Sequence, residues 1–93
     1  MPNARAREFF RYIGANVHRG RVRLGMTQEG LAEKADVDLR FLQRVERGRT
    51  NLSVAVVVAI ARALDVLPGS LFRKTNLTEP TRGRPPRRTP RTP

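Results

Sequence analysis

Residues that begin and end helices divide most of this chain into short segments. Thr27, Asp38 and Ser53 each precede an apolar run, and short oxygen-bearing side chains of this kind cap helix N-termini. Gly25 and Gly48 follow such runs and are typical of helix ends. Between these signals the apolar residues recur at the spacing of a helix. We therefore predict an all-α domain built from short helices.

Five helical segments are expected. Helices are predicted over about residues 6–24, 28–35, 39–47 and 54–64, and Pro68 opens a short fifth turn in the stretch PGSLF. After residue 73 the sequence is rich in Pro, Thr and Arg and has no aliphatic periodicity, which predicts disorder. The expected organisation is a compact five-helix bundle over residues 6–73, followed by a disordered basic tail over 74–93.

The net charge of +11 indicates a polyanionic partner, most often nucleic acid. The chain has no cysteine, which excludes a disulfide framework and thiolate metal sites. The N-terminal stretch MPNARAREFF lacks the apolar run of a secretory signal. The longest apolar run, residues 54–61, is too short to span a bilayer. We therefore expect a cytoplasmic, nucleoid-associated protein with no membrane partner.

Two predicted helices each carry a charged residue on their apolar side. Glu46 lies beside Leu42 and Val45, and Arg21 lies on the apolar side of the first helix. That side is expected to hold Phe10, Ile13, Val17 and Leu24. A charge on a core face needs an opposite charge, and a guanidinium fork fits a carboxylate. We predict that Arg21 pairs with Glu46 and orients the third helix against the first; alternatively, both side chains extend outward to solvent.

Two short helices joined by a tight turn, the second with a basic outer side, have the layout of a helix-turn-helix. The stretch MTQEGLAEKADVDLRFLQRVERGRTNLSVAVVVAIARALDV resembles the domains of Cro and phage repressors, the XRE family. The resemblance covers about residues 10–72 and includes Gly25, Thr27, Gln28, Leu31, Ala32, Ala35, Val37, Leu42, Val45, Glu46, Gly48, Asn51, Ser53, Val57, Ile60, Ala61, Ala63 and Leu64. It implies a lambda-repressor-like fold and DNA binding. Asp36 replaces the usual glycine of the turn, and aspartate tolerates the left-handed conformation.

The resemblance also implies which residues contact DNA. The third helix would lie in the major groove, with Leu39, Arg40, Gln43 and Arg44 facing base edges. Arg40 and Arg44 could each bridge guanine O6 and N7. Gln28 would contact the DNA backbone and support the reading helix. The remaining predicted DNA-binding residues are Thr27, Asp38, Arg47, Arg49, Thr50 and Asn51.

Relatives of this kind bind half-sites as dimers through the fifth helix, which implies an interface formed by Leu67, Leu71 and Phe72. The alternative is that these residues only close the core of the monomer. In the tail, Arg82 and Arg84 belong to an RGRP sequence that resembles the core of an AT-hook, a minor-groove binder. The alternative for the tail is a flexible polycation that contacts phosphates.

The sequence contains no paired carboxylates, nucleophile–base set, metal cluster or phosphate loop, so we predict no enzymatic activity and no cofactor. The predicted function is a homodimeric transcription regulator that reads a palindromic operator in double-stranded DNA. It would block or recruit RNA polymerase as a phage-type repressor, a restriction–modification controller or a general regulator. The alternative is an antitoxin or another protein-interaction module. In that case the helix-turn-helix domain is an autoregulatory anchor, and a toxin protein is the partner.

Overall fold

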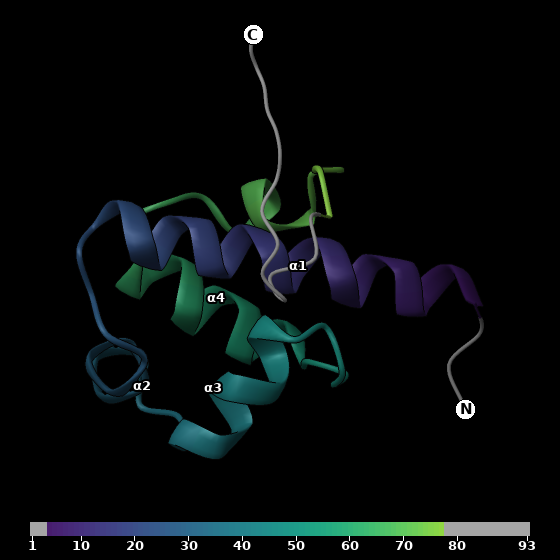
Figure 1. Ribbon diagram of the computed structural model, residues 1–93. Helices are drawn as coiled ribbons and strands as arrows, with labels where there is room; N and C mark the ends of the chain where they lie inside the picture. Colours follow the sequence, from purple (N-terminus) through teal and green to yellow (C-terminus); the bar gives the residue numbers. More distant parts are fainter. Residues whose placement is uncertain (1–3, 78–93) are drawn as a thin grey trace, which may run out of the picture.

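The computed structural model describes residues 4–77, in which helices follow one another without a strand (Figure 1). The elements are α1 (Ala4–Arg23), α2 (Gln28–Ala35), α3 (Leu39–Glu46), α4 (Val54–Ala63) and the 3-10 helix η1 (Pro68–Phe72). None of these helices has the length and apolar character needed to cross a membrane. The predicted all-α class is confirmed, with helix boundaries within about two residues of those expected.

The predicted fifth α-helix is wrong, because residues 68–72 form a 3-10 helix instead. The amide of Ser70 donates to the carbonyl of Leu67, and the amide of Arg73 donates to that of Ser70, each across three residues. Five residues are too few to form a stable α-helix, and bonds across three residues are common in turns of this length. The described residues therefore contain four α-helices and one 3-10 turn.

Side-chain caps form at the start of three helices, at the residues predicted from the sequence. Thr27 Oγ1 accepts a hydrogen bond from the amide of Gly30 at 2.9 Å, and Ser53 Oγ accepts one from the amide of Val56 at 3.1 Å. Asp38 Oδ2 accepts hydrogen bonds from the first turn of α3 at 3.0 and 3.3 Å. Each cap satisfies helix donors that would otherwise lack a partner, a contribution of about 1 kcal/mol.

One core holds the elements together. In Figure 1, α3 and α4 lie on one side of α1 and η1 lies on the other, and η1 contacts both α1 and α4. The largest fully buried side chains come from all four α-helices or their ends: Val17, Leu31, Leu42, Val45, Ile60 and Leu64. Because small apolar residues fill the rest, the core is a tightly spaced aliphatic cluster without aromatic side chains in its centre.

The apolar residues near the end of the domain differ in exposure. Leu71 is 3% exposed and packs in the core, which agrees with the alternative that it closes the core of the monomer, and its place in a dimer interface stays a prediction. The adjacent Leu67 and Phe72 are 78% and 41% exposed, so they remain available at the surface. Leu24 is 48% exposed rather than buried, because α1 ends at Arg23 and Leu24 already belongs to the turn.

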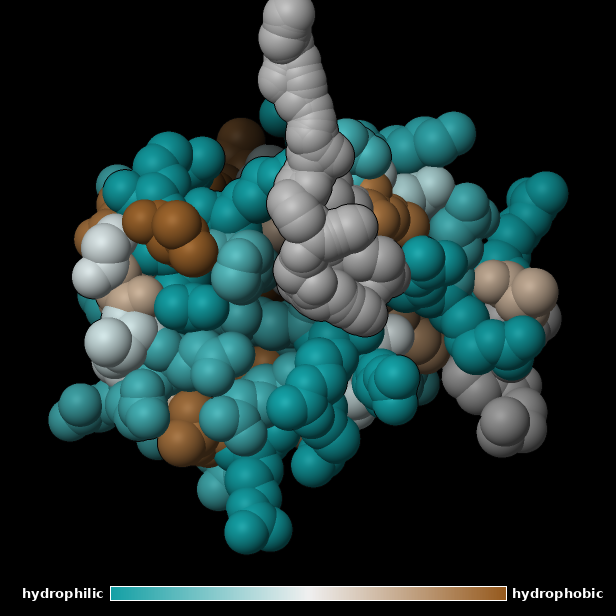
Figure 2. All heavy atoms as spheres, viewed as in Figure 1, coloured by the Kyte–Doolittle hydropathy of each residue, from teal (hydrophilic) through white to brown (hydrophobic). Residues whose placement is uncertain are grey.

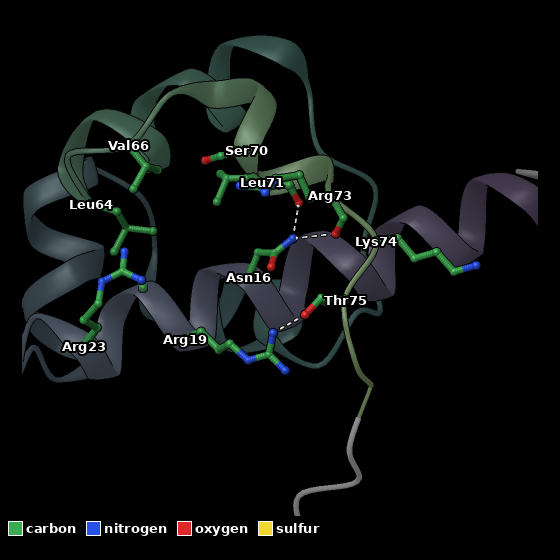
Figure 3. A pocket seen from close by; sticks show the side chains of 11 residues that line it. Asn16, Arg19, Arg23, Leu64, Val66, Ser70, Leu71, Arg73, Lys74 and Thr75 are labelled. Carbon is green, nitrogen blue, oxygen red and sulfur yellow. Dashed lines mark hydrogen bonds between the residues drawn. The ribbon is translucent and has the colours of Figure 1, made fainter.

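The segment after η1, residues 73–77, runs back along α1 without regular secondary structure. The Asn16 amide donates to the carbonyls of Leu71 and Arg73, both at 2.9 Å, and Arg19 donates to the hydroxyl of Thr75 (Figure 3). Arg19 also donates to the carbonyl of Asn76 at 3.0 Å. The chain beyond the predicted domain end at residue 73 is therefore hydrogen-bonded to α1 as far as Asn76. Most of the predicted tail, including Arg82 and Arg84, lies outside the described residues.

Candidate nucleic-acid interface

A short turn fixes the angle between α2 and α3. Asp36 adopts the left-handed conformation, with φ 59° and ψ 49°, and its amide donates to the last turn of α2. The amide of Val37 donates to the carbonyl of Ala32 at 2.9 Å, after which Asp38 already caps α3. An aspartate accepts this conformation more readily than most non-glycine residues, so the turn forms although glycine is absent.

The outer side of α3 is cationic. Leu42 and Val45 are buried, whereas Arg40 and Arg44 are exposed, as is Arg47 at the C-terminal end of the helix. In Figure 2, hydrophilic side chains predominate on the lower face of the molecule, where α3 lies. The predicted row of arginines is therefore presented outward from a helix whose inner side is fixed in the core.

Leu39 and Phe41 modify the predicted reading surface. Leu39 is half-buried and packs against the core, which leaves little of its side chain for a thymine methyl group. The guanidinium carbon of Arg44 lies 5.8 Å from the centre of the Phe41 ring, within the range of a cation–π contact. Phe41 was not among the predicted site residues, although its spacing of three from Arg44 places both on one side of a helix.

Arg21 and Glu46 form a two-pronged ion pair between α1 and the end of α3. Arg21 Nε donates to Glu46 Oε2 at 2.6 Å, and Arg21 Nη2 donates to Glu46 Oε1 at 3.1 Å. The side chains are 13% and 5% exposed, respectively. Arg21 Nη1 also donates to the carbonyl of Met26 at 2.9 Å, so most of the guanidinium donors have a partner. Both side chains turn inward and meet, rather than extending to solvent.

The ion pair is the centre of a larger polar network that reaches α3's outer side. Gln28 Nε2 donates to Glu46 Oε1 at 3.1 Å, and Gln43 Nε2 donates to Gln28 Oε1 at 3.4 Å. His18 Nδ1 lies 3.1 Å from the same Oε1 of Glu46. His18, which is exposed on α1, was not among the predicted site residues. Its position one turn before Arg21 was the available signal that it would share this face of α1.

The surroundings of Glu46 decide its protonation. Burial raises the pKa of this carboxyl, but hydrogen bonds from Arg21, His18 and Gln28 lower it by more, so the pKa lies below its ordinary value. A carboxylate with a lowered pKa stabilises the folded state fully above its pKa in the unfolded chain. That stabilisation is lost as the pH falls through the pKa in the folded chain.

We therefore expect the domain to lose stability in acid, and part of that loss to come from Glu46. The measurement is urea unfolding at a series of pH values from neutral down to below the ordinary glutamate pKa. Glu46→Gln has no carboxyl to titrate at this position, so its free energy of unfolding should fall less steeply with acid than that of the wild type. Identical pH dependence in the two proteins would contradict this assignment.

Glycine allows the backbones of α1 and α3 to touch. A Cβ placed on Gly14 would lie 2.3 Å from the carbonyl oxygen of Val45 and 2.9 Å from that of Glu46. A Cβ on Gly48 would lie 2.8 Å from Cα of Arg11, and Gly48 also has a positive φ of 71°. A glycine inside an isolated helix is destabilising relative to alanine. At Gly14 the structure shows close packing of α1 against the last turn of α3 and the residues that follow it.

Other predicted DNA-binding residues have structural contacts of their own. Thr27 and Asp38 use side-chain oxygens as helix caps, so their contact with DNA stays a prediction. Thr50 is half-buried, and its hydroxyl donates to the carbonyl of Asn51 at 3.5 Å. Arg49 is exposed beside them on the loop between α3 and α4. The predicted residues therefore lie at the start of α2, on α3 and on the loop that follows α3.

Comparison with known proteins identifies the same region. The family model described as helix-turn-helix matches residues 17–71. An HTH-type transcriptional regulator of Sinorhizobium fredii is 33% identical over 66 residues, which are 71% of this chain and 86% of that protein. The restriction-modification controller protein C.AhdI from Aeromonas hydrophila has 33% sequence identity and a TM-score of 0.65, over 68% of this chain and 96% of that chain.

A propionyl-CoA carboxylase regulator of Cereibacter sphaeroides is 36% identical over 55 residues. The match covers 59% of this chain but 12% of that regulator, so the chain spans a small part of its length. Residues 17–71, which the family model matches, contain α2, α3 and α4 and all the predicted DNA-binding residues between Thr27 and Asn51.

Proposed function

This chain belongs to the helix-turn-helix family, and from this premise we propose that it is a sequence-specific DNA-binding transcription regulator. The observation that carries the proposal is the rigid outward presentation of α3. Its inner side is fixed by buried Leu42 and Val45, and its C-terminal end is fixed by the Arg21–Glu46 pair. A helix held in this way can enter a major groove without losing conformational freedom on binding.

The polar groups on α3 fit base recognition. Arg40 and Arg44 form no ion pair with a carboxylate among residues 4–77, so their N–H groups can bridge guanine O6 and N7, and the contact of Arg44 with the Phe41 ring leaves its hydrogen-bond donors unused. Gln43 is oriented by Gln28, which is itself held by Glu46. A glutamine amide fixed at one end can read an adenine edge with a smaller entropic cost. Base reading is therefore assigned to the N-terminal two turns of α3.

In this proposal the protein acts as a homodimer that binds a palindromic operator. Leu67 and Phe72 expose apolar surface beside η1, and a two-fold axis through this region would present two copies of α3 to successive half-sites. Arg47, Arg49 and Asn51, together with the tail, would contact phosphates. Bound in this way over or beside a promoter in the cytoplasm, the dimer would exclude or recruit RNA polymerase.

Selection of bound duplexes from a random pool tests the proposal. The wild type should enrich a palindromic consensus, which a module that binds only proteins would not do. Arg44→Ala should cost about 1–3 kcal/mol of binding free energy and relax the preference at one base pair in each half-site. Arg62→Ala removes an exposed charge on α4 and should leave the consensus unchanged. Equal weakening of all sequences by Arg44→Ala would contradict its role in base reading.

A further inference from the structure

A basic cleft opens between α1 and the segment that follows α3. It has a volume of about 720 Å³, and its lining includes Arg11 and Arg19 from α1 and Arg47 and Arg49 from the other side. His18 and Glu46 also line it. The carboxylate of Glu46 is already neutralised by Arg21, so the four arginines dominate the charge of the cleft.

Within the part of the chain that the structure describes, these four arginines form no ion pair. Arg11, Arg47 and Arg49 are exposed and make no ion pair with any carboxylate among residues 4–77. Arg19 is held by the Thr75 hydroxyl and the carbonyl of Asn76, neither of which carries a charge. Several like charges around one concave surface attract an anion strongly, because a cleft with low-dielectric walls focuses their field.

The two walls of the cleft cannot separate to relieve this repulsion. Gly48 packs so closely on α1 that an added Cβ would lie 2.8 Å from Cα of Arg11. Gly14 brings α1 equally close to the last turn of α3. The cations are therefore held at the cleft by backbone packing, which pre-organises them for a ligand.

A second hollow beside residues 73–77 is lined by cations that are arranged differently. That hollow has a volume of about 430 Å³ and lies between α1 and η1. In Figure 3, the Lys74 side chain points away from it, and Arg19 is directed to Thr75. Its other cations are Arg23 and Arg73, so it is lined by three arginines, whereas the cleft beside Gly48 is lined by four.

We propose that this cleft binds a phosphate group of the DNA backbone beside the bases contacted by α3, with Arg11 as the contact from α1. The inference rests on the proposed function. Arg47 follows α3 directly, about one helical turn after Arg44, so a duplex against Arg44 passes the mouth of the cleft. Arg11 precedes residues 17–71, so this contact extends the interface beyond the matched region.

Arg11→Gln tests the proposal, because glutamine keeps the Cβ and Cγ atoms that pack on Gly48 but removes the charge. Binding should weaken alike for preferred and random duplexes, and the slope of log K against log[salt] should become shallower by about 1. If the wild type and Arg11→Gln bind DNA equally at 1 M salt, the loss of one phosphate contact makes the binding constant of the variant about eightfold lower than that of the wild type at 0.1 M salt. Arg11→Lys should restore the slope.

Arg62→Gln is the matched control, since it removes the same charge from an exposed position on α4 that does not line the cleft. Equal salt slopes for Arg11→Gln and Arg62→Gln would overturn the proposal. The proposal would also be overturned if inorganic phosphate stabilised the protein only when Arg11 is present, while DNA binding did not depend on Arg11. The selected consensus separates the two hypotheses. If the wild type selects a palindrome and Arg11→Gln changes nothing, only the cleft assignment fails.

Discussion

Replacing Glu46 by alanine is expected to lower the free energy of unfolding by about 3–5 kcal/mol. The substitution leaves the Arg21 guanidinium, 13% exposed, without its carboxylate and without two hydrogen-bond acceptors. It also leaves the amide of Gln28 without the acceptor that orients it. Urea unfolding followed by circular dichroism measures the loss. Glu33→Ala, at an exposed position on α2, is the control and should change stability by less than about 0.5 kcal/mol.

A double variant separates stability from orientation. Arg21→Met combined with Glu46→Leu removes both charges, and replacing a buried ion pair by apolar residues is often neutral. We expect this protein to recover most of the stability lost in Glu46→Ala. Its DNA binding should remain weaker and less selective, because Gln28 and Gln43 have lost their anchor. Full recovery of both properties would show that the pair does not position α3.

The short-range part of this structure was readable from the sequence. The caps Thr27, Asp38 and Ser53 act on donors within three residues, so helix starts follow from neighbouring residues alone. The Arg21–Glu46 pair spans 25 residues but was predictable, because each charge interrupts an otherwise apolar helix side. The exposure of Arg40 and Arg44 follows from the same periodicity.

The parts that could not be predicted depend on how distant segments pack. The hydrogen bonds from Asn16 to Leu71 and Arg73 join residues that are 55 and 57 positions apart, and no local sequence pattern predicts them. Whether Leu71 faces the core or a second subunit depends on where η1 docks, which periodicity in five residues does not define. The role of a glycine inside a helix depends on which other segment packs against it.

Gly14→Ala tests the role of a helical glycine. The substitution is expected to lower the free energy of unfolding by more than about 2 kcal/mol. This loss is expected although alanine favours a helix by up to about 1 kcal/mol relative to glycine. The new Cβ would lie 2.3 Å from the carbonyl oxygen of Val45 and 2.9 Å from the amide nitrogen of Gly48. Both are backbone atoms, so no side-chain rotation relieves the overlap. The end of α3 has to move away from α1, and DNA affinity should fall even at temperatures where the variant is folded.

Gly20→Ala provides the comparison within the same helix. Its Cβ would lie 3.3 Å from a terminal carbon of Leu64, and a shift of a few tenths of an ångström relieves this contact, for which the hollow that both residues line leaves room. The helix-forming preference of alanine then offsets the crowding, and stability and DNA affinity should remain close to those of the wild type. If the two variants behaved alike, the separation between α1 and α3 would not depend on Gly14. The orientation of the reading helix would then rest on the Arg21–Glu46 pair and the core alone.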